Sequence, residues 1–246
     1  MAADWVGRFA SAGDRTVSIL AVIPVRGGSK GIPRKNLRDV AGKPLVVWTI
    51  EQALAARPHI DVLVSTDDAE IAAVAEDAGA QVPFLRPAEL AVDTAATEPT
   101  VEHALAWWRE HRGEPDGVML LQATSPIRLP GTIDRAAQQF SSSGADSIVG
   151  VVPQTPFLWW ASDPPSADYD VANRQRRQEI SADRMRYRET GSLYVTKPRI
   201  YDELHNRLGG RIELFVMDDA EGVDIDTELD LAYAAAILGA SPKRWQ

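Results

Sequence analysis

Short apolar runs alternate with helical patterns along most of this chain, and this alternation restricts the fold more than any other feature. The strand-like runs are Ile19–Pro24, Asp61–Ser65, Gln81–Leu85, Gly117–Leu121, Ser147–Val152, Gly191–Val195 and Ile212–Val216. The helical patterns are Pro44–Ala56, Ala69–Ala78, Pro99–Glu110, Gly131–Ser142 and Glu228–Leu238. Strands separated by helices of this length form right-handed βαβ units. The sequence therefore predicts a doubly wound α/β fold with a mostly parallel sheet.

Composition excludes several classes of protein. The 246 residues suffice for one α/β domain, with or without a lobe, and the net charge of −9 argues against a nucleic-acid partner. The absence of cysteine excludes disulfides, thiolate catalysis and cysteine zinc sites. No apolar run approaches the roughly 18 residues that a membrane span needs. Residues 1–16 lack the apolar core of a secretory signal. We therefore expect a cytoplasmic protein with no membrane partner and with a flexible N-terminal extension over residues 1–17.

The first predicted strand runs into a basic, glycine-rich loop. The segment from Ile19 to Asn36 reads ILAVIPVRGGSKGIPRKN. Glycines let backbone N–H groups approach an anion closely, and the cations beside them suit a polyphosphate; these cations are Arg26, Lys30, Arg34 and Lys35. Neither the dinucleotide pattern G-x-G-x-x-G nor the ATPase pattern G-x-x-x-x-G-K-[ST] is present. A solvated basic loop is the alternative, but the position after a buried strand of an acidic chain favours an anion site.

Two carboxylates frame a single apolar residue near the C-terminus, at Asp224-Ile225-Asp226. In extended backbone, residues two apart project to the same side, so both carboxylates point together while Ile225 points to the core. Paired carboxylates suit Mg²⁺, which prefers oxygen ligands. An equally good interpretation makes Asp226 the N-cap of the last helix, with Glu228 in its first turn. The two interpretations are compatible.

Three other polar segments follow predicted strands. Ser65-Thr66-Asp67-Asp68 is best interpreted as a helix start capped by Thr66 or Asp67. The segment RPAEL at 86–90, followed by Asp93-Thr94-Ala95, has the pattern of a turn and a helix start. The third segment places Gln122, Thr124, Ser125 and Arg128 at the carboxyl end of a strand, where α/β sheets bind ligands.

One stretch, from Pro153 to Tyr187, interrupts the alternation. It contains four prolines, a cationic run around Arg176 and Arg177, and several aromatic residues. A long irregular insert rich in arginine and aromatic residues is more often an interface or a substrate lid than packed core.

Taken together, these segments resemble the acylneuraminate cytidylyltransferases, also called CMP-sialic acid synthetases. The resemblance runs in order over nearly the whole chain from Ile19, through IPVRGGSKGIPRKN, GKPLVVWTI, VSTDD, RPAELAVDTA, LLQATSPIR, YRETGSLYV and DIDTELDL. An ordered set of this kind is far more specific than one glycine loop. The related octulosonate cytidylyltransferases differ in the first loop, where they lack the G-S-K-G-x-x-x-K-N pattern.

The resemblance implies a Rossmann-like fold of the nucleotide-diphospho-sugar transferase type. Residues 18–246 would be the cytidylyltransferase domain, with a protruding lobe over 153–190 that serves dimerisation or substrate binding. It implies Mg²⁺-dependent transfer of CMP from CTP to the anomeric hydroxyl of a nonulosonic (sialic-type) acid, with release of pyrophosphate. A homodimer is expected for the same reason.

The resemblance also implies residue roles. The triphosphate would be held by Arg26, Ser29, Lys30 and Lys35, with Lys35 the main stabiliser of charge at the reacting phosphate. The nucleoside would meet Asn36, Arg86, Ala95 and Thr97. The sugar acid would meet Gln122, with Arg177 and Arg188 as candidates for its carboxylate, and Asp224 and Asp226 would bind Mg²⁺. The catalytic residues would be Lys35, Arg26 and Asp224, and either Asp224 or a metal-bound water could accept the proton.

One departure falls on the sugar side. Where many relatives read R-x-N-G, this chain reads Arg188-Glu189-Thr190-Gly191, so a hydroxyl replaces an amide. This leaves open the activation of an eight-carbon or amino-ulosonic acid. A nucleotide-binding relative without turnover is the alternative from another class, and the presence of Lys35, Asp224 and Asp226 argues against it. The absence of G-x-G-x-x-G argues against a dehydrogenase.

Overall fold

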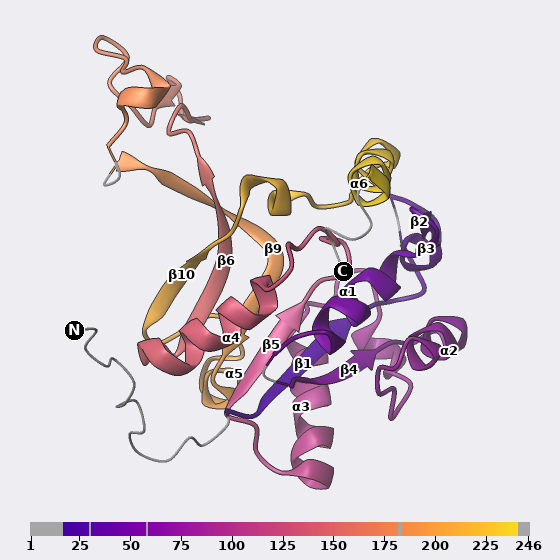
Figure 1. The fold of residues 1–246 in the computed structure, drawn as a ribbon. Helices are drawn as coiled ribbons and strands as arrows, with labels where there is room; N and C mark the ends of the chain where they lie inside the picture. The colour runs from indigo at the N-terminus through magenta and orange to yellow at the C-terminus, as the bar shows by residue number, and fades with distance from the viewer. Residues whose placement is uncertain (1–16, 30, 58, 182–183, 241–246) are drawn as a thin grey trace, which may run out of the picture.

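A six-stranded, mostly parallel sheet organises the chain (Figure 1). The computed structural model describes residues 17–29, 31–57, 59–181 and 184–240. The strand order is β10 (Ile212–Val216), β6 (Ser147–Gln154), β9 (Arg186–Thr196), β5 (Gly117–Leu121), β1 (Ile19–Pro24) and β4 (Asp61–Ser65). Strand β9 runs antiparallel to both neighbours, and the other neighbouring pairs are parallel. β1 and β5 are continuous apolar runs because helices cover both of their faces.

Helices lie on both sides of the sheet, as the doubly wound prediction requires. One face packs against α1 (Leu45–Leu54), α2 (Ala69–Asp77) and α4 (Thr132–Ser143), and the other against α3 (Glu98–Arg112) and α5 (Pro198–Leu204). The last helix, α6 (Glu228–Ala240), packs on a separate cluster that includes Trp48 and Ile225. No helix in the described residues is long and apolar enough to cross a membrane.

Short elements complete the fold. These are the hairpins β2 (Asp39–Val40) with β3 (Lys43–Pro44) and β7 (Trp159–Trp160) with β8 (Ser166–Ala167), and the 3₁₀ turns η1 (Lys35–Leu37), η2 (Ala88–Leu90), η3 (Arg177–Glu179) and η5 (Asp219–Gly222). Helix α3 has Pro99 in its first turn and Arg109, His111 and Arg112 in its last, the asymmetry that helix ends favour.

The predicted strand at Gln81–Leu85 is wrong. The segment makes only two isolated bridges, from Gln81 to Leu63 in β4 and from Leu85 to Thr66, the residue after β4. Pro83 lies between them and has no N–H for a ladder, which explains why no continuous strand forms. Sequence patterns also missed α5 and the first half of β9, which begins at Arg186 instead of Gly191.

The insert predicted over 153–190 projects from the sheet (Figure 1). Its ends are regular: β6 and β9 continue pairing beyond the sheet as far as Gln154 and Arg186. Between them the chain forms a small lobe in which the Arg174 guanidinium lies 4.2 Å from the ring centroid of Phe157. Trp160 on this lobe is 67% exposed. Residues 1–16, most of the predicted flexible extension, lie outside the described residues.

Candidate active site

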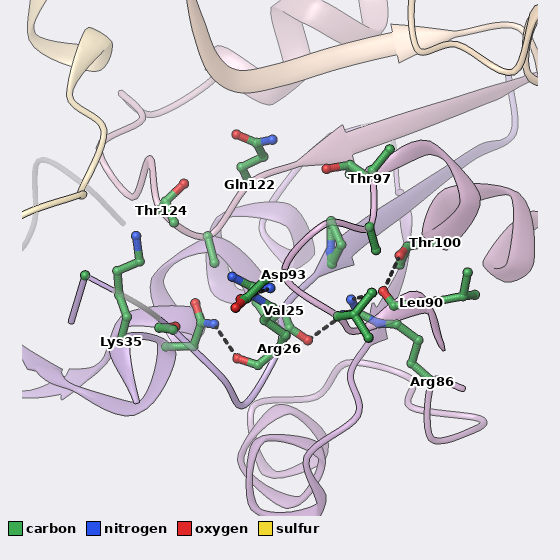
Figure 2. Close-up of a pocket in the computed structure, with 18 of the residues that line it drawn as sticks. Val25, Arg26, Lys35, Arg86, Leu90, Asp93, Thr97, Thr100, Gln122 and Thr124 are labelled. Carbon is green, nitrogen blue, oxygen red and sulfur yellow. Dashed lines mark hydrogen bonds and ion pairs between the residues drawn. The ribbon is translucent and has the colours of Figure 1, made fainter. Parts of the chain in front are cut away.

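A cavity of about 440 Å³ opens at the carboxyl ends of β1 and β5 (Figure 2). This is the edge at which open α/β sheets bind ligands. Its lining includes nine of the residues predicted for the site: Arg26, Ser29, Lys35, Asn36, Arg86, Ala95, Thr97, Gln122 and Asp226. Lys30, also predicted for the triphosphate, lies outside the described residues. Segments separated by up to 200 positions in the sequence (26 and 226) therefore meet in one hollow.

Arg26 lines the cavity and forms an ion pair with Asp93, a residue that sequence analysis did not assign to the site (Figure 2). The Arg26 Nη1 atom lies 2.9 Å from Oδ1 of Asp93. Asp93 and Thr94 were interpreted as a helix start, but α3 begins at Glu98, so this interpretation is wrong. The backbone carbonyl of Arg26 accepts a hydrogen bond of 3.1 Å from Nδ2 of Asn36, which is buried. Asn36 thus fixes the backbone of the basic loop.

Lys35 also lines the cavity, and its side chain contacts the acidic segment at residues 224–226. Its Nζ donates to the carbonyl of Ile225 and lies 3.5 Å from Oδ1 of Asp226. The Lys35 side chain is only 13% exposed. Gly31 brings the two segments together, since a Cβ there would lie 2.7 Å from the carbonyl oxygen of Asp226. Gly31 therefore allows the basic loop to pack against residues 224–226.

The acidic segment at 224–226 belongs to no helix or strand, and Ile225 points into the core as predicted. The cap of α6 is formed by other residues: the Thr227 hydroxyl accepts from the Asp230 N–H at 3.3 Å, and the Asp230 carboxylate accepts from the N–H groups of Asp226 and Thr227. The interpretation of Asp226 as the N-cap is therefore wrong. Asp226 lines the cavity, and its side chain is 77% exposed.

The two carboxylates fit a divalent cation chemically. Asp224 does not line the cavity, and its Oδ1 accepts a hydrogen bond of 3.3 Å from the Ser125 hydroxyl. In the described residues no group of three or more acidic or histidine side chains could hold a metal ion by itself. Two carboxylate oxygens suit Mg²⁺ in the many sites where phosphates and waters complete the coordination.

The start of the second helix is also capped differently from the prediction. Asp68 is the N-cap, with its Oδ1 accepting from the N–H groups of Glu70 and Ile71. Asp67 instead accepts from the N–H of Gly27 at 3.1 Å, which ties the basic loop to the end of β4.

Arg86 lines the cavity, but its guanidinium is engaged by the backbone. Nη2 donates to the carbonyls of Val25, at 2.5 Å, and Ser65, and Nη1 to that of Leu90 at 3.4 Å. Burial lowers the pKa of Arg86; the Asp67 carboxylate acts in the opposite direction, and Arg26 adds to the lowering. Arg86 therefore joins the ends of β1 and β4 to the loop that forms the cavity wall.

The residues predicted for the sugar acid are only partly brought together. Gln122 lines the cavity, whereas Arg177 is exposed on the lobe and Arg188 donates to the carbonyl of Gly222 at 2.8 Å. Neither arginine lines the cavity. Thr190, the departure from R-x-N-G, is buried, and its hydroxyl donates to the Gly150 carbonyl at 3.0 Å. The hydroxyl is therefore directed into the sheet.

Comparisons with known proteins identify the fold and the family. A sequence model of the family described as cytidylyltransferase matches residues 20–198. The chain is 35% identical over 224 residues to the CMP-N,N'-diacetyllegionaminic acid synthase of Legionella pneumophila, covering 89% of this chain and 96% of that protein. It is 34% identical to N-acylneuraminate cytidylyltransferase A of Danio rerio, covering 86% of this chain and 49% of the fish protein. This chain thus spans about half the length of that relative.

Solved structures show the same architecture at much lower identity. The structure of CMP:2-keto-3-deoxy-manno-octonic acid synthetase complexed with CTP superposes with a TM-score of 0.69 at 18% identity, covering 91% of this chain and 99% of that one. This likeness shows the fold, which agrees with the Rossmann-like prediction. With the family model matching most of the sequence, the chain belongs to the cytidylyltransferase family of nucleotidyltransferases.

Proposed function

We propose that this enzyme transfers CMP from CTP to the anomeric hydroxyl of a nonulosonic acid and releases pyrophosphate. One observation carries the proposal: a single cavity is lined by Arg26 and Lys35 of the basic loop, by Asp226, and by Gln122 after β5. Cations for a triphosphate, a carboxylate for a metal ion and an amide for a sugar therefore surround one space. The names of the relatives, which refer to legionaminic and acylneuraminic acids, support the sugar class.

The reaction needs no covalent enzyme intermediate. The anomeric oxygen attacks the α-phosphorus of CTP, a new P–O bond forms, the bond from the α-phosphorus to the bridging oxygen breaks, and pyrophosphate leaves. The hydroxyl proton passes to a base, either the Asp224 carboxylate or a water. Catalysis then consists of positioning and of stabilising the negative charge that develops on the phosphates.

Lys35 is suited to this stabilisation. Its ammonium group is largely shielded from solvent and is held at Asp226 and at the carbonyl of Ile225. An oriented cation in a site of reduced solvent access acts more strongly on a phosphate than one in bulk water does. Arg26 would exchange Asp93 for a phosphate, since a guanidinium binds either anion through the same donors.

Mg²⁺ would be held by Asp224 and Asp226. When bound there, the ion would neutralise phosphate charge and orient the triphosphate. Lys35 pairs with the Asp226 carboxylate, so this carboxylate would not face the phosphates with its full charge before the ion binds.

The sugar carboxylate and the assembly of the protein are further parts of the proposal. Arg177 and Arg188 have the planar fork that recognises a carboxylate with two hydrogen bonds. Because Arg177 is on the projecting lobe, away from the cavity of its own chain, its proposed role depends on the lobe of a homodimer partner or on lobe movement. The exposed Trp159 and Trp160 on the same lobe favour an interface.

The test is pyrophosphate release from CTP, UTP, ATP and GTP with a panel of eight- and nine-carbon keto-sugar acids. We expect turnover with CTP and nine-carbon acids. Turnover restricted to an eight-carbon acid would reassign the sugar. Measurable CTP binding with no turnover on any acid would favour a nucleotide-binding protein without catalysis.

A further inference from the structure

A buried arginine outside the cavity holds the wall to which Gln122 belongs. Arg128 is 1% exposed, and within the described parts of the chain no carboxylate forms an ion pair with it. Burial lowers the pKa of its guanidinium to about 10, and the Glu221 carboxylate partly offsets this effect. Removing a charge from water without a direct counter-ion is costly, so the arrangement calls for a specific role.

The guanidinium joins three elements through neutral acceptors. Nη2 donates to the carbonyl of Gln122 at 2.9 Å and to that of Ser192 at 2.8 Å. Nη1 donates to Oγ1 of Thr49 and to Oε1 of Gln52, both at 3.1 Å, on α1. The end of β5, the middle of β9 and the covering helix are thus connected by one side chain.

The same connection is reinforced by other hydrogen bonds. The Gln52 amide donates to the carbonyl of Pro126 at 2.9 Å, so α1 also holds the turn that follows Gln122. The Gln122 N–H donates to the carbonyl of Ser192 at 3.4 Å, which makes Ser192 an acceptor for both Gln122 and Arg128. The main chain of Gln122 is therefore fixed on both of its polar groups.

The Gln122 side chain is positioned by a glycine in the segment that Arg128 holds. The pairing of β6 with β9 shifts register between Val149 and Val151, a bulge opposite residues 190–193. Gly191 lies in this bulge with φ +72°, and a Cβ on it would lie 2.7 Å from Oε1 of Gln122. The side-chain amide of Gln122 therefore packs directly on bare backbone, and its place depends on how the bulge is held against β5.

We infer that Arg128 is a positioning residue for the sugar acid: by fixing Gln122 and the Gly191 bulge together, it sets the location of the Gln122 amide in the cavity. This inference rests on the proposed function and adds to it a residue that does not touch either substrate. The basic loop shares none of these hydrogen bonds, so Arg128 makes no direct contact with the CTP half of the site.

Arg128→Lys keeps the positive charge but removes the planar guanidinium group that donates to several acceptors at once. Because a displacement of about 1 Å in a positioned group can cost up to ~10²-fold in rate, we expect kcat/KM for the sugar acid to fall by roughly 10- to 100-fold. The KM for CTP should stay within about twofold, because its pocket keeps its contacts. Phe140→Leu serves as the control for a loss of stability alone, since Phe140 lies on the buried face of α4 and packs in the core.

The decisive step is a double-mutant cycle with Gln122→Ala. If Arg128 acts through Gln122, Arg128→Lys should change kcat/KM for the sugar acid by less than about twofold in the Gln122→Ala background. Equal losses in both backgrounds, or an equal rise in the KM for CTP, would overturn the inference. If wild-type protein releases no pyrophosphate from CTP with any acid, the proposed function fails first, and the two failures are thereby distinguished.

Chemical rescue adds a readout that a general packing defect would not give. A second cavity of about 160 Å³ between α1 and α4 is lined by Arg128 and Gln52. In Arg128→Ala, methylguanidinium added to the assay can enter from this cavity and should restore part of kcat/KM for the sugar acid. Methylammonium should restore less, because it lacks the planar fork. Failure of both ions, with the variant folded by thermal melt, would count against the positioning role.

Discussion

The Nζ atom of Lys35 lies 3.5 Å from the Oδ1 atom of Asp226, so the basic loop after β1 and the acidic segment before α6 share one ion pair. These segments are 190 positions apart in the sequence, and Gly31 allows their backbones to approach. The pairing places the principal cation and the proposed metal ligand side by side.

Lys35→Met should reduce CMP transfer by ~10²–10³-fold, the loss typical of one transition-state charge stabiliser. Lys43→Met is the matched control, because Lys43 is similarly shielded and paired with Glu51 but lies outside the cavity. Its turnover should stay close to that of wild type. Pyrophosphate release measures both, and equal losses in the two variants would argue against a catalytic role for Lys35.

Asp226→Asn should raise the Mg²⁺ concentration for half-maximal rate by about 10-fold or more, the lower end of what disturbed metal sites show. Its thermal melt should change little, because Thr227 and Asp230 cap α6. Asp230→Asn removes the same charge from the neighbouring helix and should leave the Mg²⁺ dependence unchanged. A parallel shift in both variants would mean that net charge, not ligation, is responsible.

Gly31→Ala should destabilise the fold by about 1–3 kcal/mol, the usual cost of overpacking, because the added methyl meets the Asp226 carbonyl. Gly28→Ala in the same loop meets nothing within 4 Å and should melt as wild type does. Calorimetry compares the two. Equal melting temperatures would show that residues 31 and 226 do not pack as described.

Acid should remove the contribution of the Asp230 cap. Hydrogen bonds from the side chain and then the backbone of Thr227 lower the pKa of Asp230. A lowered folded-state pKa stabilises the fold above the unfolded value of about 3.9 and loses this effect as pH falls through the folded value. The difference in melting temperature between wild type and Asp230→Ala should therefore be full near neutral pH and shrink below about pH 4. A constant difference across this range would contradict the assignment.

The lobe should mediate a homodimer. Light scattering should give about twice the 26.8 kDa chain mass at micromolar concentration. Trp160→Asp places a charge on an exposed aromatic of the lobe and should yield the monomer, since aromatic residues carry much of the binding energy at interfaces. A wild-type monomer, or a dimer unaffected by this substitution, would contradict a lobe interface.

Periodicity predicted the sheet well because its central strands are continuous buried runs. It failed at Gln81–Leu85, where the apolar composition is that of a strand but Pro83 interrupts the ladder. It also misplaced the cap of α6. The spacing T-x-x-D from Thr227 to Asp230 is a capping-box signal that could have separated Thr227 from Asp226.

The order of the motifs was enough to predict that the residues of the candidate site gather, and nine of them do line one cavity. The arrangement of the residues predicted for the sugar acid was less predictable from the sequence. Arg128 follows Gln122 by six positions in the same motif, yet its side chain is buried against α1. The Gln122 side chain packs on a bulge of β9, a strand about 70 positions further along the sequence. Long-range register of this kind is set by tertiary packing and leaves no local signature.

CMP transfer is most directly tested by following the products formed from CTP and a nine-carbon keto-sugar acid by ³¹P NMR in the presence of Mg²⁺. We expect equal amounts of pyrophosphate and of a phosphodiester joining CMP to the anomeric oxygen, with both forming far more slowly in Lys35→Met. Phosphate release without the phosphodiester, or a UMP phosphodiester formed as readily from UTP, would contradict this expectation.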